Sequence, residues 1–267
     1  MNKTVFALVT DAKYLTRTYR TISDLRTVGS WHGDIVVVTI DFHLSEEYKR
    51  KFNIIEKKFD IIDKSYLLFR IGPDGFENSD KREINKLNQW EKFHIFDDYF
   101  LNWDRVVFLD AGLRVLDNVS YILELNYKGK LLAPIDGIRP RDIFRFQVDH
   151  GNEYEINKLI SDFGHEILDS RYMLNCIWVY DTNILKICNK KQLIDAMNKY
   201  PICRTNEMTI MNILFHFKYK LWEPFPSISS NGKYLFEWCD GNNPNTNWRN
   251  YCFLKYPISI SINSSPI

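Results

Sequence analysis

The sequence predicts an α/β protein with a mostly parallel central sheet flanked by helices. Apolar, strand-like segments alternate with segments of helical spacing through the first half of the chain. Two of the apolar runs are nearly uninterrupted, as expected for strands that are buried on both faces of a parallel sheet. This alternation is typical of βαβ units, in which a crossover helix follows each parallel strand.

Composition and charge narrow the possible functions. The 267 residues are 45% apolar and 26% charged, which is enough apolar material for a substantial core. The net charge of +1 gives no electrostatic reason to expect nucleic acid or an anionic membrane as a partner. Five cysteines without a close pair indicate reduced thiols. No apolar run is long enough for a membrane span or a signal-peptide core, so we expect a cytoplasmic protein.

The first half of the chain contains the clearest predicted elements. Strands are expected at residues 4–10, 34–40 and 59–62, and in the apolar run that ends at Asp110. Apolar residues recur at helical spacing in residues 15–25, 45–52 and 84–95.

The second half is less regular. We expect strands at residues 130–135 and 173–180, and helices at residues 154–168, 187–199 and 207–217. The chain from Pro224 onward is rich in Pro, Gly, Asn and Ser, so an irregular lobe is predicted there, with loops at residues 139–151 and 241–250. Because no linker-like segment interrupts the sequence, residues 1–267 are expected to form a single domain.

Polar residues stand at or near the ends of several predicted strands, where open α/β sheets bind their ligands. These candidates are Thr10, Asp11, Tyr14, Asp110, Asp136, Asn175 and Glu207, with Lys86 on the helix before Asp110. Asp110 is the sharpest candidate, because an apolar run precedes it and the small residues Ala111 and Gly112 follow. Such carboxylates hold a ribose or a metal, or balance charge at a reacting carbon. Strand-end polar residues also simply cap helices or close turns, which is the structural alternative.

Five segments together resemble glycosyltransferase family 8, the glycogenin and galactosyltransferase-like group. They are residues 8–14, Lys86, residues 108–112, residues 174–180 and residues 207–212. The resemblance covers about residues 4–217, and the order and spacing of the segments carry it. It implies the nucleotide-sugar-binding fold called GT-A, in which residues 1–125 form a nucleotide-binding half and residues 126–267 an acceptor-side half.

The resemblance also implies roles for individual residues. Val9, Thr10 and Tyr14 would hold the nucleobase, and Lys86 would face the diphosphate or the donor sugar. Asp110 would reach the ribose or a metal, with Ala111 and Gly112 leaving room for the nucleotide. The remaining implied positions are Asp11 and Asp136 in the nucleotide site, Asn175 beside the donor sugar, and Glu207 as the carboxylate under the reacting sugar.

The sequence departs from the family at its metal site. Gly112 stands where the family has a second metal-binding Asp, and no His follows His216 to supply the usual histidine ligand. A hard divalent cation needs several oxygen ligands. Either the donor diphosphate and water complete the shell of Mn²⁺ or Mg²⁺ on Asp110, or cations such as Lys86, Arg139 and Arg141 balance the charge without a metal.

The function implied by the resemblance is transfer of a hexose from a nucleotide sugar, a UDP-hexose, to a glycan or glycoprotein acceptor. Family members retain the anomeric configuration, so retention is expected here. Many members are dimers, so a homodimer is implied, although the sequence leaves the oligomeric state open.

Two alternatives remain. One is a catalytically silent relative that binds a nucleotide sugar or glycan, which the altered metal motif favours. The other is a sugar nucleotidyltransferase, a class that usually has a glycine-rich amino-terminal loop. Here no glycine occurs between Val9 and Gly29, which disfavours that class.

Overall fold

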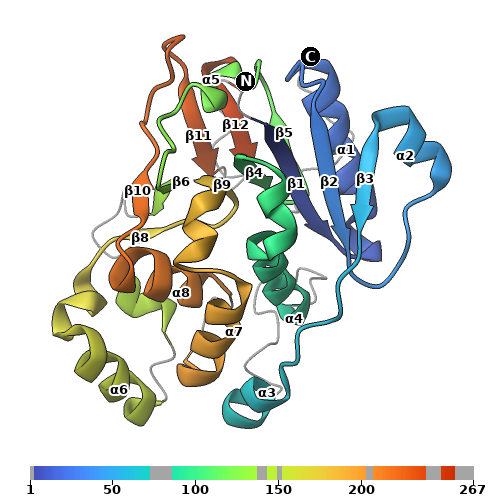
Figure 1. Ribbon diagram of the computed structural model, residues 1–267. Helices are drawn as coiled ribbons and strands as arrows, with labels where there is room; N and C mark the ends of the chain where they lie inside the picture. The colour runs from blue at the N-terminus through green and yellow to red at the C-terminus, as the bar shows by residue number, and fades with distance from the viewer. Residues whose placement is uncertain are drawn as a thin grey trace.

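The centre of the molecule is a seven-stranded sheet. The computed structural model describes residues 3–72, 86–136, 143–148, 152–202, 207–238 and 248–255. The strand order is β10-β6-β9-β4-β1-β2-β3, and all neighbours are parallel except β9, which is antiparallel to β4 and β6 (Figure 1). The strands span Thr4–Thr10 (β1), Asp34–Thr39 (β2), Ile54–Lys57 (β3), Arg105–Leu109 (β4), Leu131–Ala133 (β6), Ile177–Asp181 (β9) and Trp222–Pro224 (β10). The predicted α/β class with a mostly parallel sheet is confirmed.

Both faces of this sheet are buried, which explains its continuous apolar runs. All seven residues of β1 are buried, and its side chains alternate between two hydrophobic cores. Val5, Ala7 and Val9 belong to one core, whereas Phe6 and Leu8 belong to the other. Complete burial of a large apolar side chain stabilises a fold by about 1.5–3 kcal/mol.

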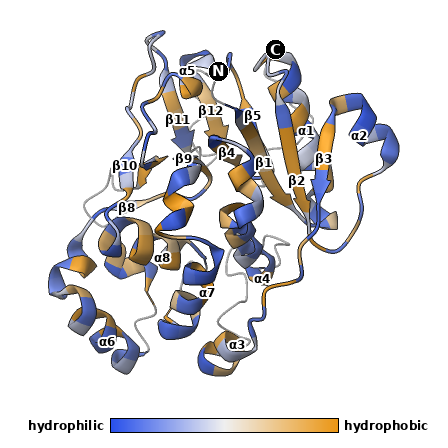
Figure 2. Ribbon diagram, viewed as in Figure 1, coloured by the Kyte–Doolittle hydropathy of each residue, from blue (hydrophilic) through white to orange (hydrophobic). Residues whose placement is uncertain are grey.

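Helices cover the sheet from both sides. The first core is completed by helices α3, α6, α7 and α8 and the second by α1 and α5. Figure 1 shows α1 and α2 beside β2 and β3, with α3, α6 and α7 grouped below the sheet. The helices span Leu15–Thr27 (α1), Glu46–Phe52 (α2), Ser65–Ile71 (α3), Lys86–Gln89 (α4), Ser120–Leu123 (α5), Glu153–Phe163 (α6), Lys190–Lys199 (α7) and Glu207–Met211 (α8). Polar residues lie along much of α2, α6 and α7, whereas β1 and β2 are hydrophobic (Figure 2).

A second, smaller sheet packs against the core on the α1 side. It contains β11 (Tyr234–Trp238), β12 (Tyr251–Lys255) and β5 (Leu113–Val115) in that order. The prediction that the chain is irregular from Pro224 onward is therefore wrong for β11 and β12. Both strands are short, and β12 pairs with the distant β5, so composition alone did not reveal them. In a third sheet, β7 (Ile135–Asp136) pairs with β8 (Tyr172–Met173).

The strand predicted at residues 59–62 is also wrong. The edge strand is β3, which ends at Lys57, and the chain then runs on without strand pairing. Within this segment, the Ile62 backbone N–H donates to the Glu91 side chain (3.2 Å) instead of to a neighbouring strand.

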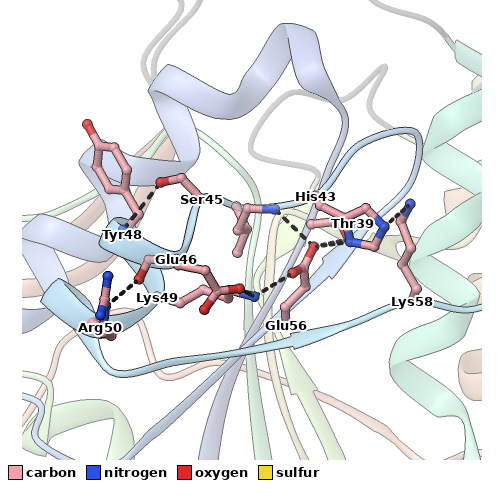
Figure 3. Close-up of polar contacts among 10 residues, drawn as sticks. Thr39, His43, Ser45, Glu46, Tyr48, Lys49, Arg50, Glu56 and Lys58 are labelled. Atoms are coloured by element: carbon pink, nitrogen blue, oxygen red, sulfur yellow. Dashed lines mark hydrogen bonds and ion pairs between the residues drawn. The ribbon is translucent and has the colours of Figure 1, made fainter.

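A half-buried carboxylate anchors the loop between β2 and α2 (Figure 3). Glu56 Oε1 accepts hydrogen bonds from the Thr39 hydroxyl and the Leu44 backbone N–H, both at 3.0 Å. Its Oε2 lies 3.3 Å from Lys49 Nζ, and His43 Nδ1 lies 3.3 Å from Oε1. We call Glu56 and these four partners the Glu56 cluster. Both carboxylate oxygens are thus satisfied by neighbouring groups.

Across the described segments, no helix combines the length and the apolar character needed to cross a lipid bilayer.

Candidate active site

Asp110 lies where β4 ends, at the edge of the sheet that also contains the end of β1. Its backbone N–H donates to the Cys176 carbonyl (2.8 Å), and its carbonyl accepts from the Leu113 N–H (3.0 Å). The first bond ties Asp110 to the chain just before β9. Because β9 is antiparallel to β4, residues before its start, including Asn175, lie at this same edge.

Two lysines hold the Asp110 carboxylate. Lys92 Nζ lies 2.9 Å from Oδ1, and Lys255 Nζ lies 2.8 Å from Oδ2. Lys255 Nζ also lies 3.4 Å from the Ala111 carbonyl. Lys92 comes from the 3-10 helix Trp90–Phe96, in which every residue is buried, and Lys255 is the last residue of β12. Three segments far apart in the sequence therefore meet at Asp110.

Glu207 extends this group at the start of α8. Its side chain is 2% exposed, and Oε1 accepts from Lys92 Nζ (2.8 Å) and from Asn175 Nδ2 (2.6 Å). Its second oxygen, Oε2, is buried and has no hydrogen-bond partner among the described residues. We call Asp110, Lys92, Lys255, Glu207 and Asn175 the Asp110 cluster.

A side-chain bridge keeps Asn175 and Glu207 together. The Asn212 amide accepts from the Met173 N–H (2.8 Å) and donates to the Met173 carbonyl (3.1 Å) and the Met208 carbonyl (2.9 Å). Asn212 begins a π-helical turn that continues α8. Such turns are frequent at functional sites. The bridge fixes the chain before Asn175 against the first turn of the helix that carries Glu207.

Burial and charge shift the proton affinities of the cluster in opposite directions. Burial raises the pKa of Glu207, and Lys92 offsets this rise only in part. At Asp110 burial also favours the neutral acid, but Lys255 and Lys92 outweigh it and lower the pKa. Burial alone would lower the pKa of Lys92, yet Asp110 and Glu207 raise it. Lys92 is therefore a stable ammonium and Asp110 a stable carboxylate at neutral pH.

The side chains of the candidate residues at the end of β1 form hydrogen bonds with neighbouring protein groups. Thr10 is 2% exposed, and its hydroxyl accepts from the Thr18 hydroxyl (2.7 Å). Asp11 caps the following 3-10 turn by accepting from the Tyr14 N–H (3.0 Å) and accepts from Asn88 Nδ2 (2.9 Å). Asp11 therefore caps a helical turn, which is the structural alternative given above for strand-end polar residues.

The other candidates of the nucleotide half lie around this edge. Val9 is 9% exposed, next to Thr10 on β1. The half-buried Tyr14 ring has the Arg17 guanidinium 5.5 Å from its centroid. Lys86 begins α4, and the cations in contact with Asp110 are Lys92 and Lys255.

The remaining candidates lie in or near segments that the structure does not fully describe. The backbone of Asp136 ends β7. Arg139 and Arg141 lie outside the described residues, as do most of the loops predicted at residues 139–151 and 241–250.

Sequence reasoning missed both lysines of the cluster. A Lys in a helix usually faces solvent, and nothing in the spacing around Lys92 indicates a fully buried 3-10 helix. For Lys255 a signal existed, because residues 251–254 form a short, mostly apolar run. The surrounding Pro, Gly, Asn and Ser obscured it.

Gly112 has a backbone conformation that favours glycine. Its φ is +86°, and its N–H donates to the Thr21 hydroxyl (3.1 Å). A Cβ at this position would lie 3.4 Å from the side chain of Arg17. An L-residue in the left-handed region costs about 1–2 kcal/mol. Glycine thus stands where the family motif has its second acid, and the backbone conformation at this position disfavours an Asp side chain. Beside it, Ala111 is 8% exposed and small enough to leave the edge open.

The residues at this edge do not fit a divalent metal. Both oxygens of Asp110 already face ammonium groups. Among the residues that the structure describes, no group of three or more His, Cys, Asp or Glu side chains is placed to hold a metal ion. Mn²⁺ and Mg²⁺ both require several oxygen ligands. The ligand set expected from the family is not present around Asp110.

Comparison with known proteins identifies the fold. No protein-family model and no curated sequence matches the chain. Among solved structures, the galactosyltransferase LgtC in complex with donor and acceptor sugar analogues superimposes with a TM-score of 0.62 at 13% identity. The match covers 94% of this chain and 86% of LgtC. This protein has the GT-A glycosyltransferase fold.

Other glycosyltransferases share this GT-A fold. The bifunctional glycosyltransferase WbbM matches with a TM-score of 0.60 at 14% identity over 95% of this chain. The match covers 45% of WbbM, so this chain spans under half of that protein. Mouse xyloside xylosyltransferase 1 matches with a TM-score of 0.52 at 9% identity, covering 98% of both chains.

Proposed function

We propose that the protein is a glycosyltransferase of family 8 that moves a hexose from a UDP-sugar to a glycan or protein acceptor with retention of anomeric configuration. Residues 1–267 would act as one domain, with the nucleotide held by residues 1–125 and the acceptor approached by residues 126–267. The GT-A fold supports the general class, and the Asp110 cluster supports the reaction.

The observation that carries the proposal is the unsatisfied oxygen of Glu207. A buried carboxylate oxygen without a hydrogen-bond partner is costly to a fold, so its retention needs an explanation. A hydroxyl of the donor sugar, or positive charge developing on that sugar, would supply the missing partner. The Asn175 amide and the Lys92 ammonium hold the other oxygen, so Glu207 is already oriented.

The reaction breaks the bond between the anomeric carbon and the diphosphate oxygen, and the bonding pair leaves with UDP. The acceptor hydroxyl oxygen forms the new bond on the same face, and its proton passes to the departing diphosphate oxygen. Glu207 would stabilise the cationic sugar, and Asn175 would hydrogen-bond a sugar hydroxyl. Both contributions are electrostatic and positional, and need no covalent intermediate.

The nucleotide half would bind UDP at the end of β1. The ring of Tyr14 would stack on the base, with Val9, Thr10 and Asp11 shaping its floor. Asp110, Ala111 and Gly112 would face the ribose, and the small side chains of the latter two leave space there. Asp136, at the end of β7, would complete the site from the acceptor side.

The test is release of UDP from UDP-glucose, UDP-galactose and UDP-N-acetylglucosamine, with and without a panel of saccharide acceptors. The proposal predicts release from at least one donor that increases when a suitable acceptor is present. The linkage of the product, read by NMR, reports retention. Failure to release UDP from any donor and failure to bind UDP would together refute the proposal.

A second candidate is a catalytically silent protein that binds a nucleotide sugar. The lysine pair on Asp110 and the glycine at residue 112 favour it, because the family's metal ligands are missing. The same assay separates the two functions, since tight binding of a UDP-sugar without release of UDP identifies the silent protein.

A further inference from the structure

The cations at Asp110 occupy the place where the family resemblance led us to expect a metal. Lys92 precedes Asp110 in the sequence and Lys255 follows it. Each contacts a different oxygen of the Asp110 carboxylate. Their side chains are 11% and 15% exposed, respectively, so both charges are largely shielded from water. Each is buried next to the edge where the nucleotide half and Glu207 meet.

Each ammonium keeps hydrogen-bonding capacity for a further partner. An ammonium has three N–H donors. Lys92 directs two of them to Asp110 and Glu207, and Lys255 directs two to Asp110 and the Ala111 carbonyl. Within the described residues, one donor of each lysine is left for an oxygen such as that of a phosphate. The two ammonium nitrogens lie against different oxygens of Asp110.

We propose that Lys92 and Lys255 together replace the divalent cation, so that the donor diphosphate binds and leaves without a metal. This inference rests on the proposed function. Asp110 would then act as the anchor that holds the two ammoniums, and not as a metal ligand. A divalent ion at Asp110 would have to displace both ammoniums and then remain close to two positive charges.

The conformation of Gly112 supports the same conclusion. An acid at this position would strain the backbone at φ +86°. The departure from the family motif is therefore built into the turn after Asp110 as well as into the residue type.

The simplest alternative is that Lys255 only fastens β12 to the main sheet. Lys233 offers a matched comparison, because it forms an ion pair with Asp117 near the other end of the same small sheet. Lys233→Gln removes the same kind of charge pair from the same region without approaching Asp110. A purely structural role for Lys255 would make the two Gln variants behave alike.

The experiment measures the affinity of the full chain for UDP and for uridine by calorimetry, in EDTA and in Mn²⁺. For the wild-type protein we expect the UDP affinity to agree within threefold between the two conditions. Lys255→Gln should weaken UDP binding at least tenfold and leave uridine binding within twofold. Lys255→Arg should retain most of the UDP affinity, and Lys233→Gln should match the wild type.

Each result decides the inference. A wild-type UDP affinity that falls tenfold in EDTA and returns with Mn²⁺ overturns it while leaving glycosyl transfer intact. Equal losses of UDP and uridine affinity in Lys255→Gln overturn it in favour of the structural role. Absence of UDP binding in both conditions refutes the proposed function and the inference with it. The wild-type comparison needs no variant, so a poorly folding Lys255→Gln does not prevent the test.

Discussion

Two carboxylate clusters lie near strand ends of the same sheet, and their oxygens are satisfied very differently. In the Glu56 cluster, a hydroxyl, a backbone N–H, a lysine and a histidine satisfy both oxygens (Figure 3). In the Asp110 cluster, Lys92 and Asn175 hold one oxygen of Glu207, while the other has no partner among the described residues. The pKa of Glu56 is lowered despite its burial, whereas that of Glu207 is raised.

We interpret this difference as one between a structural carboxylate, Glu56, and the carboxylate proposed to act on the donor sugar, Glu207. The partners of Glu56 all lie within one short stretch of chain, from Thr39 to Glu56 itself, so local folding can satisfy it. The Asp110 cluster gathers residues from five segments of the chain and still leaves one acid incompletely paired. A buried polar atom without a hydrogen-bond partner needs an explanation, and a ligand that completes the site is one such explanation.

The largest expected contrast is in turnover. Glu207→Gln should reduce UDP-hexose turnover about a hundredfold to a thousandfold, as is usual when an electrostatic contact to the transition state is removed. Donor affinity should change by less than about threefold, because Gln is isosteric and keeps the contact to Asn175. Glu56→Gln, assayed under the same conditions, should turn over like the wild type. Equal turnover by the wild type, Glu56→Gln and Glu207→Gln would contradict the proposed difference between the two carboxylates.

The next contrast is in stability. Asp110→Ala removes the carboxylate that pairs with Lys255 and leaves the buried Lys92 paired, among the described residues, with Glu207 alone, so it should lower the free energy of unfolding by about 3 kcal/mol. Glu56→Ala leaves the Thr39 hydroxyl and the Leu44 N–H without this acceptor, but its partners Lys49 and His43 remain accessible to water, so a loss of about 1–2 kcal/mol is expected. Urea denaturation measures both. A smaller loss for Asp110→Ala than for Glu56→Ala would contradict the view that Asp110 anchors the lysines.

Two tyrosines extend the comparison to nucleotide binding. Tyr14 lies at the edge with the Asp110 cluster, whereas Tyr48 stacks on Tyr19 beside the Glu56 cluster (ring centroids 3.7 Å apart). Tyr14→Ala should weaken UDP and uridine alike by about tenfold, because stacking of a base on an aromatic ring contributes about 1–3 kcal/mol. Tyr48→Ala should leave both affinities unchanged. Calorimetry with the two ligands measures this, and a larger effect at Tyr48 would place the base elsewhere.

The smallest contrast is in how melting temperature depends on pH. The lowered pKa of Glu56 gives stability that is present above its unfolded value and lost as pH falls through the folded pKa. The raised pKa of Glu207 has the opposite sign, because ionisation at higher pH costs stability in the folded state.

At pH 7, therefore, Glu56→Gln should melt below the wild type and Glu207→Gln at or above it. Shifts of about 2–4 °C are expected for each kcal/mol in a domain of this size. Both differences should shrink as pH falls toward 4. Calorimetric scans of the three proteins across this range measure the trend, and a stability loss at pH 7 in Glu207→Gln would contradict the strained state of that carboxyl.

The central sheet was predictable because its strands are buried on both faces. The runs at β1, β2 and β4 remain apolar throughout, and this pattern needs no knowledge of partners. The strands β11 and β12 were not predictable, since they are short and depend on pairing with β5 across more than a hundred residues. At residues 59–62 the β-branched and aromatic residues suggested a strand, but β3 ends earlier. The Ile62 N–H instead donates to the Glu91 side chain.

Part of the candidate site was also predictable, because some of its residues stand next to predicted strands and helices. Asp110, Asn175 and Glu207 stand next to regular elements, and the structure brings these three predicted residues together at one edge of the sheet. Lys92 and Lys255 were missed because nothing local distinguishes a lysine that will be buried against a distant acid from one that faces water. Their role depends on three-dimensional pairing, which spacing alone does not encode.

The most direct test of the account compares UDP release by the wild type, Glu56→Gln and Glu207→Gln from the preferred UDP-hexose with its acceptor. We expect equal release by the wild type and Glu56→Gln, and release about a hundredfold or more slower by Glu207→Gln at unchanged donor affinity. Undiminished release by Glu207→Gln would contradict the claim that the incompletely paired carboxylate at the sheet edge serves the reaction.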